Sequence, residues 1–134
     1  MDLVYGTRDG HITVAAVSDA EWRGLCAALG KPEWVDDPRF KDAAARVAHI
    51  EERKTLTAAA IADWSTQALL ERLRAADVPC APLLRREDLI EDEQVAANGL
   101  LVIESYAELG AVRQPRPVAR FDQTPSAISG PAPF

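Results

Sequence analysis

The fold is decided first by residues 4–30, VYGTRDGHITVAAVSDAEWRGLCAALG, which carry the signals of a β-hairpin followed by a helix. Two β-prone runs flank the polar turn TRDG at 7–10, and an Asp-Gly pair between such runs is typical of a hairpin. Ser18 and Glu21 have capping-box spacing, so each side chain can accept a hydrogen bond from a backbone N–H where a helix begins. We therefore expect a hairpin that leads into a helix ending at Gly30.

Helical patterns continue beyond this hairpin and helix. The first helix has an apolar face at the spacing i, i+3, i+4 and i+7, made by Trp22, Leu25, Cys26 and Leu29. A short helical turn is expected around Trp34, and a long helix at 42–63 whose inward candidates are Val47, Ile50, Leu56, Ile61 and Trp64. Ser65 is placed to cap the next helix, whose apolar face comprises Leu69, Leu70, Leu73 and Ala76.

The second half of the chain is less helical. Residues 77–84 are apolar but contain two prolines, which predicts an edge strand or an extended crossing segment. Residues 85–98 suit two short helical pieces, and strands are expected at 100–105 and 111–114. Five prolines after position 114 favour an extended end.

These elements predict an α+β fold, with a small antiparallel sheet of hairpin and C-terminal strands and with helices packed on one face. We expect a small domain at residues 1–114, followed by an extended Pro-rich segment at residues 115–134. At 134 residues and 48% hydrophobic, the chain is long enough to bury the core of one such domain.

Composition limits the partners. The net charge of −6 disfavours a phosphate backbone, so nucleic acid is not expected as a partner. No apolar run approaches the roughly 18 to 20 residues of a membrane span, and the start of the chain lacks a basic leader. We expect no membrane association and a cytoplasmic location.

Cysteine and histidine are too sparse to indicate a metal or redox site. Cys26 lies in an apolar helix face and Cys80 in a proline-flanked apolar stretch, so a disulfide between them is not expected. The two histidines are distant from both cysteines and from each other, which does not suit a zinc site. No metal and no bound cofactor are predicted.

The search for catalytic residues gives none. The 21 carboxylates include the contiguous clusters Asp36-Asp37, Glu51-Glu52 and Glu91-Asp92-Glu93, and neighbours on a helix point apart, so these acidic runs suit a solvated face. No nucleophile elbow, phosphate loop or dinucleotide fingerprint is present. From its residues alone, the chain is a globular α+β domain without an assigned reaction.

Five blocks nevertheless occur in an order that resembles the C-terminal part of class III CoA-transferases, the family of formyl-CoA transferase, carnitine-CoA transferases and α-methylacyl-CoA racemase. The blocks are YGTRDGHI at 5–12, DAEW at 19–22 with LCAALG at 25–30, DPRF at 37–40 followed by Arg46, AADVPCAP at 75–82, and DQTP at 122–125.

The resemblance implies that this chain is the small domain of a larger enzyme. The catalytic aspartate of the transferases, or the acid-base pair of the racemases, belongs to an N-terminal large domain and maps to no residue here. The substrate of the parent enzyme would be an acyl-CoA thioester, and the parent would be a homodimer of interlocked chains. We expect the chain to be inactive alone, to cover the thioester site and to shape acyl selectivity.

Within this interpretation Pro79, Cys80, Ala81 and Pro82 are the candidates to face the acyl-CoA, since a proline-stiffened edge segment can present a rigid apolar wall. The alternative for these four residues is ordinary packing. Two alternatives for the whole chain also stay open. The parent can be a racemase, or the chain can be a free-standing interaction module that keeps the small-domain fold.

Overall fold

The computed structural model describes residues 4–130 and divides into two compact units, one ending at Leu83 and the other beginning at Leu84. We predicted a boundary of another kind, between a folded domain ending at residue 114 and an extended tail starting at residue 115. That boundary stays a prediction. The two units are described separately below.

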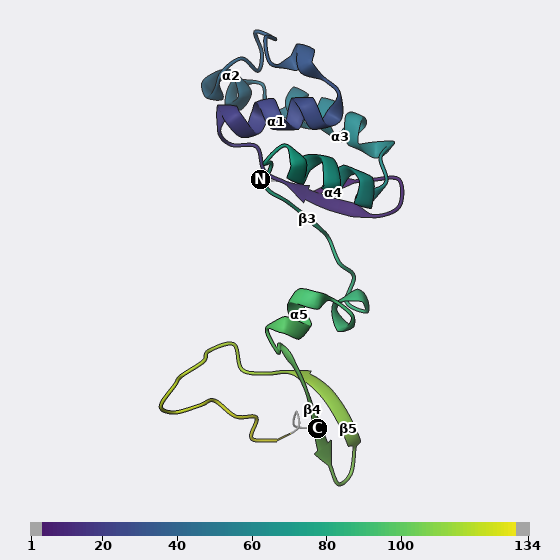
Figure 1. Ribbon diagram of the computed structural model, residues 1–134, viewed down its shortest axis with the longest axis vertical. Coiled ribbons are helices and arrows are strands. Elements are labelled where there is room, and N and C mark those ends of the chain that lie inside the picture. Colours follow the sequence, from purple (N-terminus) through teal and green to yellow (C-terminus); the bar gives the residue numbers. More distant parts are fainter. Residues whose placement is uncertain (1–3, 131–134) are drawn as a thin grey trace. The chain divides into compact units, whose positions relative to one another are not determined.

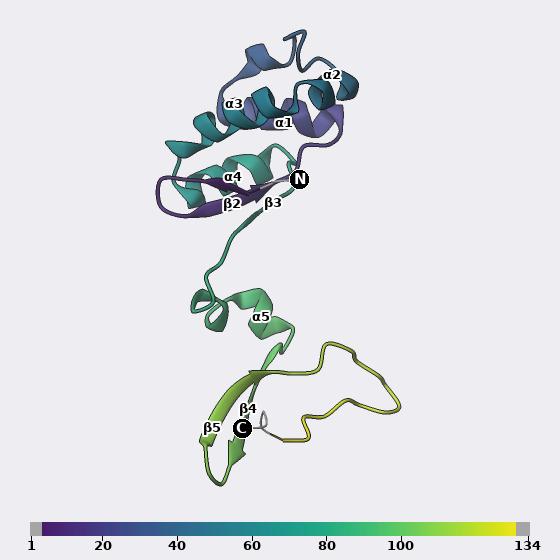
Figure 2. The same ribbon diagram turned by 180° about the vertical axis from the view of Figure 1, so that it is seen from behind.

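The first unit is a three-stranded sheet with helices on one face. Its elements are β1 (Val4–Gly6), β2 (His11–Val14), α1 (Asp19–Leu29), the 3₁₀ turn η1 (Pro32–Trp34), α2 (Ala43–Ala48), α3 (Ile50–Ala62), α4 (Thr66–Ala75) and β3 (Cys80–Pro82). The sheet is antiparallel in the order β1-β2-β3, and α1 to α4 all lie on the same side of it (Figure 1). The view from behind shows the same layering: α4 lies next to the strands and α1 packs against α4 (Figure 2).

The caps predicted for α1 are confirmed. The Ser18 hydroxyl accepts from the Glu21 backbone N–H, and the Glu21 carboxylate accepts from the backbone N–H groups of Ser18 and Val17. Gly30 ends the helix with φ 69°, a left-handed conformation that favours glycine. Local sequence chemistry is therefore enough to set both ends of this helix.

The prediction of one long helix at 42–63 is wrong, because the structure has two shorter helices there. The chain bends at His49 (φ −108°, ψ 35°), which separates α2 from α3. No glycine or proline lies in this stretch; the bend falls between two sets of tertiary contacts, those of Arg46 in α2 and those of Ile61 in α3. Val47, predicted to point inward, is instead 68% exposed because α2 turns Arg46 toward the core.

The core of the first unit comes from the sheet and from every one of its helices except α2. Its buried apolar residues are Ile12, Val14, Trp22, Leu25, Cys26, Ala28, Leu29, Trp34, Phe40, Ile61, Leu69, Leu70, Leu73 and Val78. The rings of Trp22 and Trp34 stack with centroids 6.3 Å apart, and Phe40 meets Trp22 edge-on at 5.7 Å. Two polar residues, Arg46 and Thr57, are buried among them at 2% exposure each.

The second unit contains short elements and no buried core. It comprises η2 (Asp88–Ile90), α5 (Glu93–Ala97), β4 (Leu101–Tyr106) and β5 (Gly110–Pro115), and residues 116–130 form neither helix nor strand. The two helical pieces agree with the sequence prediction; the Asp92 side chain caps α5, and Gly99 follows this helix with φ 55°. The C-terminal strands form a two-stranded sheet of their own, so the single sheet that we expected is instead two. Within residues 84–130 no side chain is buried.

Candidate functional site

The hairpin turn that carries the first resemblance block is clamped to the start of α4. The Asp9 carboxylate accepts hydrogen bonds from the Thr66 backbone N–H at 2.7 Å and from the Thr66 hydroxyl at 2.8 Å. The Thr7 hydroxyl lies 2.6 Å from the Thr66 hydroxyl. These bonds, led by the one from the Thr66 N–H, hold the pKa of Asp9 below its ordinary value. Asp9 thus caps a helix from a distant part of the chain, which is a structural role.

The block at 37–40 and Arg46 form a second clamp. Arg46 donates to the Phe40 carbonyl at 3.2 Å and to the Asp19 carboxylate at 2.6 Å, and its guanidinium lies 5.8 Å from the Trp22 ring centre. Asp37 accepts from the Arg39 side chain and backbone N–H, which lowers the pKa of Asp37 to about 2. Both arginines have carboxylate partners, so this block positions a loop and presents no free reactive group.

The four predicted acyl-CoA-facing residues lie on and beside β3, at the edge of the sheet. Cys80 pairs with Val14, Ala81 with Thr13 and Pro82 with Ile12 in the antiparallel register. Cys80 is partly buried against the core, while Pro79 and Ala81 are exposed. Because side chains alternate along a strand, Pro79 and Ala81 share the face that no helix covers within residues 4–83, and Cys80 and Pro82 take the other face. The acyl-CoA-facing role of the four stays a prediction.

The open face of the sheet is largely apolar. Besides Pro79 and Ala81 it presents Val4, 47% exposed, and Leu83, 52% exposed. The strand is stiff here, since two prolines flank it and the Pro79 carbonyl accepts from the Ala15 N–H at 3.0 Å.

Neither thiol is suited to act as a nucleophile. Burial raises the pKa of Cys26 to about 12, and burial also raises the pKa of Cys80. The thiolate is the reactive form, so burial disfavours nucleophilic attack by either cysteine. Both are free thiols.

The part of the chain that the structure describes, residues 4–130, has neither a metal-binding cluster nor a membrane-spanning helix. No group of three or more His, Cys, Asp or Glu side chains converges there. No helix in that range has the length and apolar character needed to span a bilayer.

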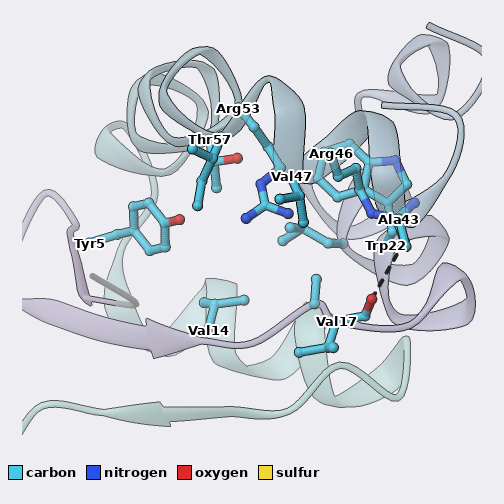
Figure 3. A pocket seen from close by; sticks show the side chains of 12 residues that line it. Tyr5, Val14, Val17, Trp22, Ala43, Arg46, Val47, Arg53 and Thr57 are labelled. Carbon is cyan, nitrogen blue, oxygen red and sulfur yellow. Dashed lines mark hydrogen bonds between the residues drawn. The ribbon is translucent and has the colours of Figure 1, made fainter. Parts of the chain in front are cut away.

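A cavity of about 160 Å³ lies between the hairpin and helices α1 to α3 (Figure 3). Its walls are mostly apolar, and its polar lining residues are Tyr5, Arg46, Arg53 and Thr57. Figure 3 shows the Arg53 guanidinium pointing from α3 toward the strand side of the cavity, between Tyr5 and Val17. Sequence reasoning missed this site. Residues 5, 14 and 53 come from three separate elements, and the only available signal was an arginine one helical turn before a buried threonine on the same helix.

The structure is an α+β domain in which the charged residues of the resemblance blocks hold loops in place. Within residues 4–130 no group of catalytic side chains converges. The chain belongs to CoA-transferase family III, whose family model matches residues 2–134. The family resemblance and the α+β class are thereby confirmed.

Two curated relatives illustrate the match. A succinate–glutarate CoA-transferase of Agrobacterium fabrum is 32% identical over 133 residues, covering 97% of this chain and 32% of the relative. A formyl-CoA:oxalate CoA-transferase of Streptomyces coelicolor is 32% identical over 98 residues, covering 70% of this chain and 23% of the relative. The chain therefore spans about a third or less of the length of these relatives.

Solved structures show the same fold. A CAIB/BAIF family protein from Brucella suis superimposes with a TM-score of 0.80 at 25% identity, over 98% of this chain and 33% of that one. Rv3272 from Mycobacterium tuberculosis gives a TM-score of 0.80 at 22% identity, over 99% of this chain and 37% of that one.

Proposed function

We propose that this chain is the part of an acyl-CoA transferase that covers the CoA-thioester site and shapes acyl selectivity, and that it does not turn over substrate alone. The observation that carries the proposal is the open, apolar face of the sheet at Pro79, Ala81 and Leu83, in a domain without convergent catalytic groups among residues 4–130. A face of this kind contributes surface and leaves the chemistry to another domain.

A rigid apolar cover suits the reaction proposed for the parent enzyme. A carboxylate that attacks an acyl-CoA thioester forms a mixed anhydride, and water would hydrolyse that intermediate. A proline-stiffened strand can exclude water without the entropy cost of ordering a flexible loop. The alternating exposure of β3 supports a cover formed by Pro79 and Ala81, with Cys80 and Pro82 behind them on the helix side.

The second unit supports a larger parent. Residues 84–130 bury no side chain, yet they expose apolar residues including Ile103 at 63% and Phe121 at 59%. A segment without its own core needs another surface to pack on. The surface we propose is the large domain, within a homodimer, and the roughly threefold greater length of the relatives is consistent with it. The cytoplasmic location stays a prediction.

Two alternatives from the sequence differ in support. The relatives reported above carry the names of CoA-transferases, which favours a transferase over a racemase as the parent. A free-standing interaction module is less well supported, because its second unit would have to function without a buried core.

The test is complementation between the chain and the missing two thirds. The purified chain with succinyl-CoA and glutarate should give no glutaryl-CoA by chromatography. A chimera in which this chain replaces the 133 matched residues of the Agrobacterium relative should give it. Turnover by the chain alone would contradict the proposal.

Selectivity is tested in the same chimera. Ala81→Trp adds a large side chain to the open face and should change the preference between acyl acceptors. Arg23→Met, at an exposed position of α1, is the matched control and should not. Unchanged acceptor preference in Ala81→Trp would remove β3 from the acyl-facing surface.

A further inference from the structure

The cavity between the hairpin and α1 to α3 combines apolar walls with an arginine that forms no ion pair within residues 4–130. Val14, Val17, Val47 and Ile50 line it together with smaller apolar groups. Arg53 lines it too and is only partly exposed. No carboxylate or carbonyl within residues 4–130 accepts a hydrogen bond from the Arg53 side chain, whereas Arg46 beside it is paired with Asp19.

The acidic residues nearest in sequence to Arg53 are engaged elsewhere. Glu52 accepts from Arg39 at 3.3 Å and lies 3.7 Å from His49, and Glu51 pairs with Lys54. Burial raises the pKa of the Tyr5 phenol, and the charges of Arg53 and Lys54 oppose that shift. Among residues 4–130 no side chain is paired with the Arg53 guanidinium, so the cavity wall presents its positive charge.

Other hydrogen-bond donors line the same cavity. The Thr57 hydroxyl makes no hydrogen bond with residues 4–130, although Thr57 is 2% exposed. Tyr5 directs its phenol toward Thr57 (Figure 3). The Arg53 guanidinium and the Thr57 hydroxyl therefore offer hydrogen-bond donors at the cavity wall to a ligand that accepts hydrogen bonds.

We propose that this cavity binds a short-chain organic carboxylate, with the carboxylate on Arg53 and the hydrocarbon chain against Val14, Val17 and Ile50. The guanidinium offers two parallel N–H donors to a carboxylate, and the Thr57 hydroxyl is a second donor on the same helix, one turn further on.

The size of the cavity selects the ligand. A cavity of about 150 Å³ accepts benzene, so one of about 160 Å³ has room for a carboxylic acid of about four to six carbons. A CoA thioester is far too large to enter. The occupant is thus a free carboxylate or a carboxylate side chain from the part of the protein outside this chain. The site is independent of the proposed cover function, because it lies inside the first unit and away from the open face of the sheet.

The experiment uses the whole chain and three probes of equal length: hexanoate, hexan-1-ol and hexylammonium. Methyl-resolved NMR titration should show saturable shifts at Val14, Val17 and Ile50 with hexanoate, at a Kd on the order of 1 mM. Hexan-1-ol should bind about tenfold or more weakly, since it lacks the charge-assisted bond, and hexylammonium should not bind.

Two variants test whether the Arg53 guanidinium is the group that binds the carboxylate. Arg53→Met keeps the length of the side chain and should weaken hexanoate binding about tenfold while leaving the affinity for hexan-1-ol unchanged. Arg23→Met, exposed on α1, is the control and should bind hexanoate like the parent chain. The probe series on the unmodified chain decides the proposal even when a variant folds poorly.

The proposal is overturned if hexanoate produces no saturable shifts at the cavity methyls, or if hexan-1-ol binds as tightly as hexanoate. Unchanged hexanoate affinity in a folded Arg53→Met variant also overturns it. Loss of transfer in the chimera has no bearing on these results, so failure of the cover function and failure of the carboxylate site are distinguishable.

Discussion

Replacing Gly24 by alanine should destabilise the first unit, although the same change stabilises an ordinary helix. Gly24 lies inside α1, where alanine is favoured over glycine by about 1 kcal/mol. A Cβ at this position would lie 2.5 Å from the carbonyl oxygen of Ala76 and 2.8 Å from Cγ2 of Val78. Helix α1 therefore approaches the 76–78 turn more closely than any side chain at position 24 permits.

The magnitude follows from how firmly that turn is held. The Ala76 N–H donates to the Arg72 and Leu73 carbonyls at 3.2 and 3.1 Å, and the Val78 N–H donates to Leu73 at 2.9 Å. Relief of the contact requires a backbone shift of roughly 1 Å, so the cost belongs at the upper end of overpacking, about 3 kcal/mol. After the gain in helix propensity of about 1 kcal/mol, the net loss is about 2 kcal/mol.

Tryptophan fluorescence isolates the relevant transition. All three tryptophans, Trp22, Trp34 and Trp64, lie in the first unit, so their emission reports its unfolding without a contribution from the second. A loss of about 2 kcal/mol should lower Tm by roughly 10 °C in a unit of this size. Ala27→Gly, at an exposed position of the same helix, calibrates propensity alone and should cost about 1 kcal/mol. A Gly24→Ala variant as stable as the parent would refute the close approach.

Three further predictions concern single residues of the first unit and use the same fluorescence measurement in urea. Arg46→Met should cost about 2 kcal/mol because it leaves the Phe40 carbonyl without its donor, whereas Asp19→Asn should cost less than about 1 kcal/mol because Asp19 is 58% exposed. Equal losses of stability in the Arg46→Met and Asp19→Asn variants would contradict this difference. Asp77 has φ 54°, so Asp77→Gly should stabilise by about 1 kcal/mol and Asp77→Ala should not; equal stability of the two would mean that the left-handed backbone is unstrained. The bonds from the Arg39 side chain and backbone lower the pKa of Asp37 from 3.8 to about 2, so this clamp stabilises the fold above about pH 4 and is lost as the pH falls toward 2. Asp37→Asn should flatten the pH dependence of stability in that window, and an unchanged slope would exclude Asp37 as its source.

Local signals predicted most helix and strand ends, because the groups that set them are adjacent in sequence. Ser18 and Glu21 are three residues apart, and Gly30 adopts the left-handed backbone that its position suggested. The bend at His49 could not be predicted in this way. Its neighbours all favour a helix, and tertiary contacts of Arg46 turn the chain there.

The candidate site was predicted only where it follows from one strand. Proline spacing placed 79–82 at a sheet edge, and strand alternation then divides the four residues between two faces. The cavity around Arg53 has no such local signature, since Tyr5 and Thr57 reach it from elements 52 residues apart in the chain. Sites of this kind become visible only when the packing is known.

The blocks that identify the family are those that hold the scaffold, and this explains why the residue search found no chemistry in them. Asp9 is used to cap α4, Arg46 to fix the loop ending at Phe40, and Asp37 to hold Arg39. Each of these charged groups is hydrogen-bonded to another part of the protein, so none is available to a substrate. Uncharged exposed residues of the open sheet face, such as Ala81, are not engaged in this way. Differences in acyl preference between members of the family should therefore follow positions of the open sheet face and not the charged residues of the blocks. Substitutions at Ala81 should change selectivity at unchanged Tm, whereas Asp9→Ala should lower Tm at unchanged selectivity, and the reverse pattern would show that the charged residues of the blocks contact the substrate.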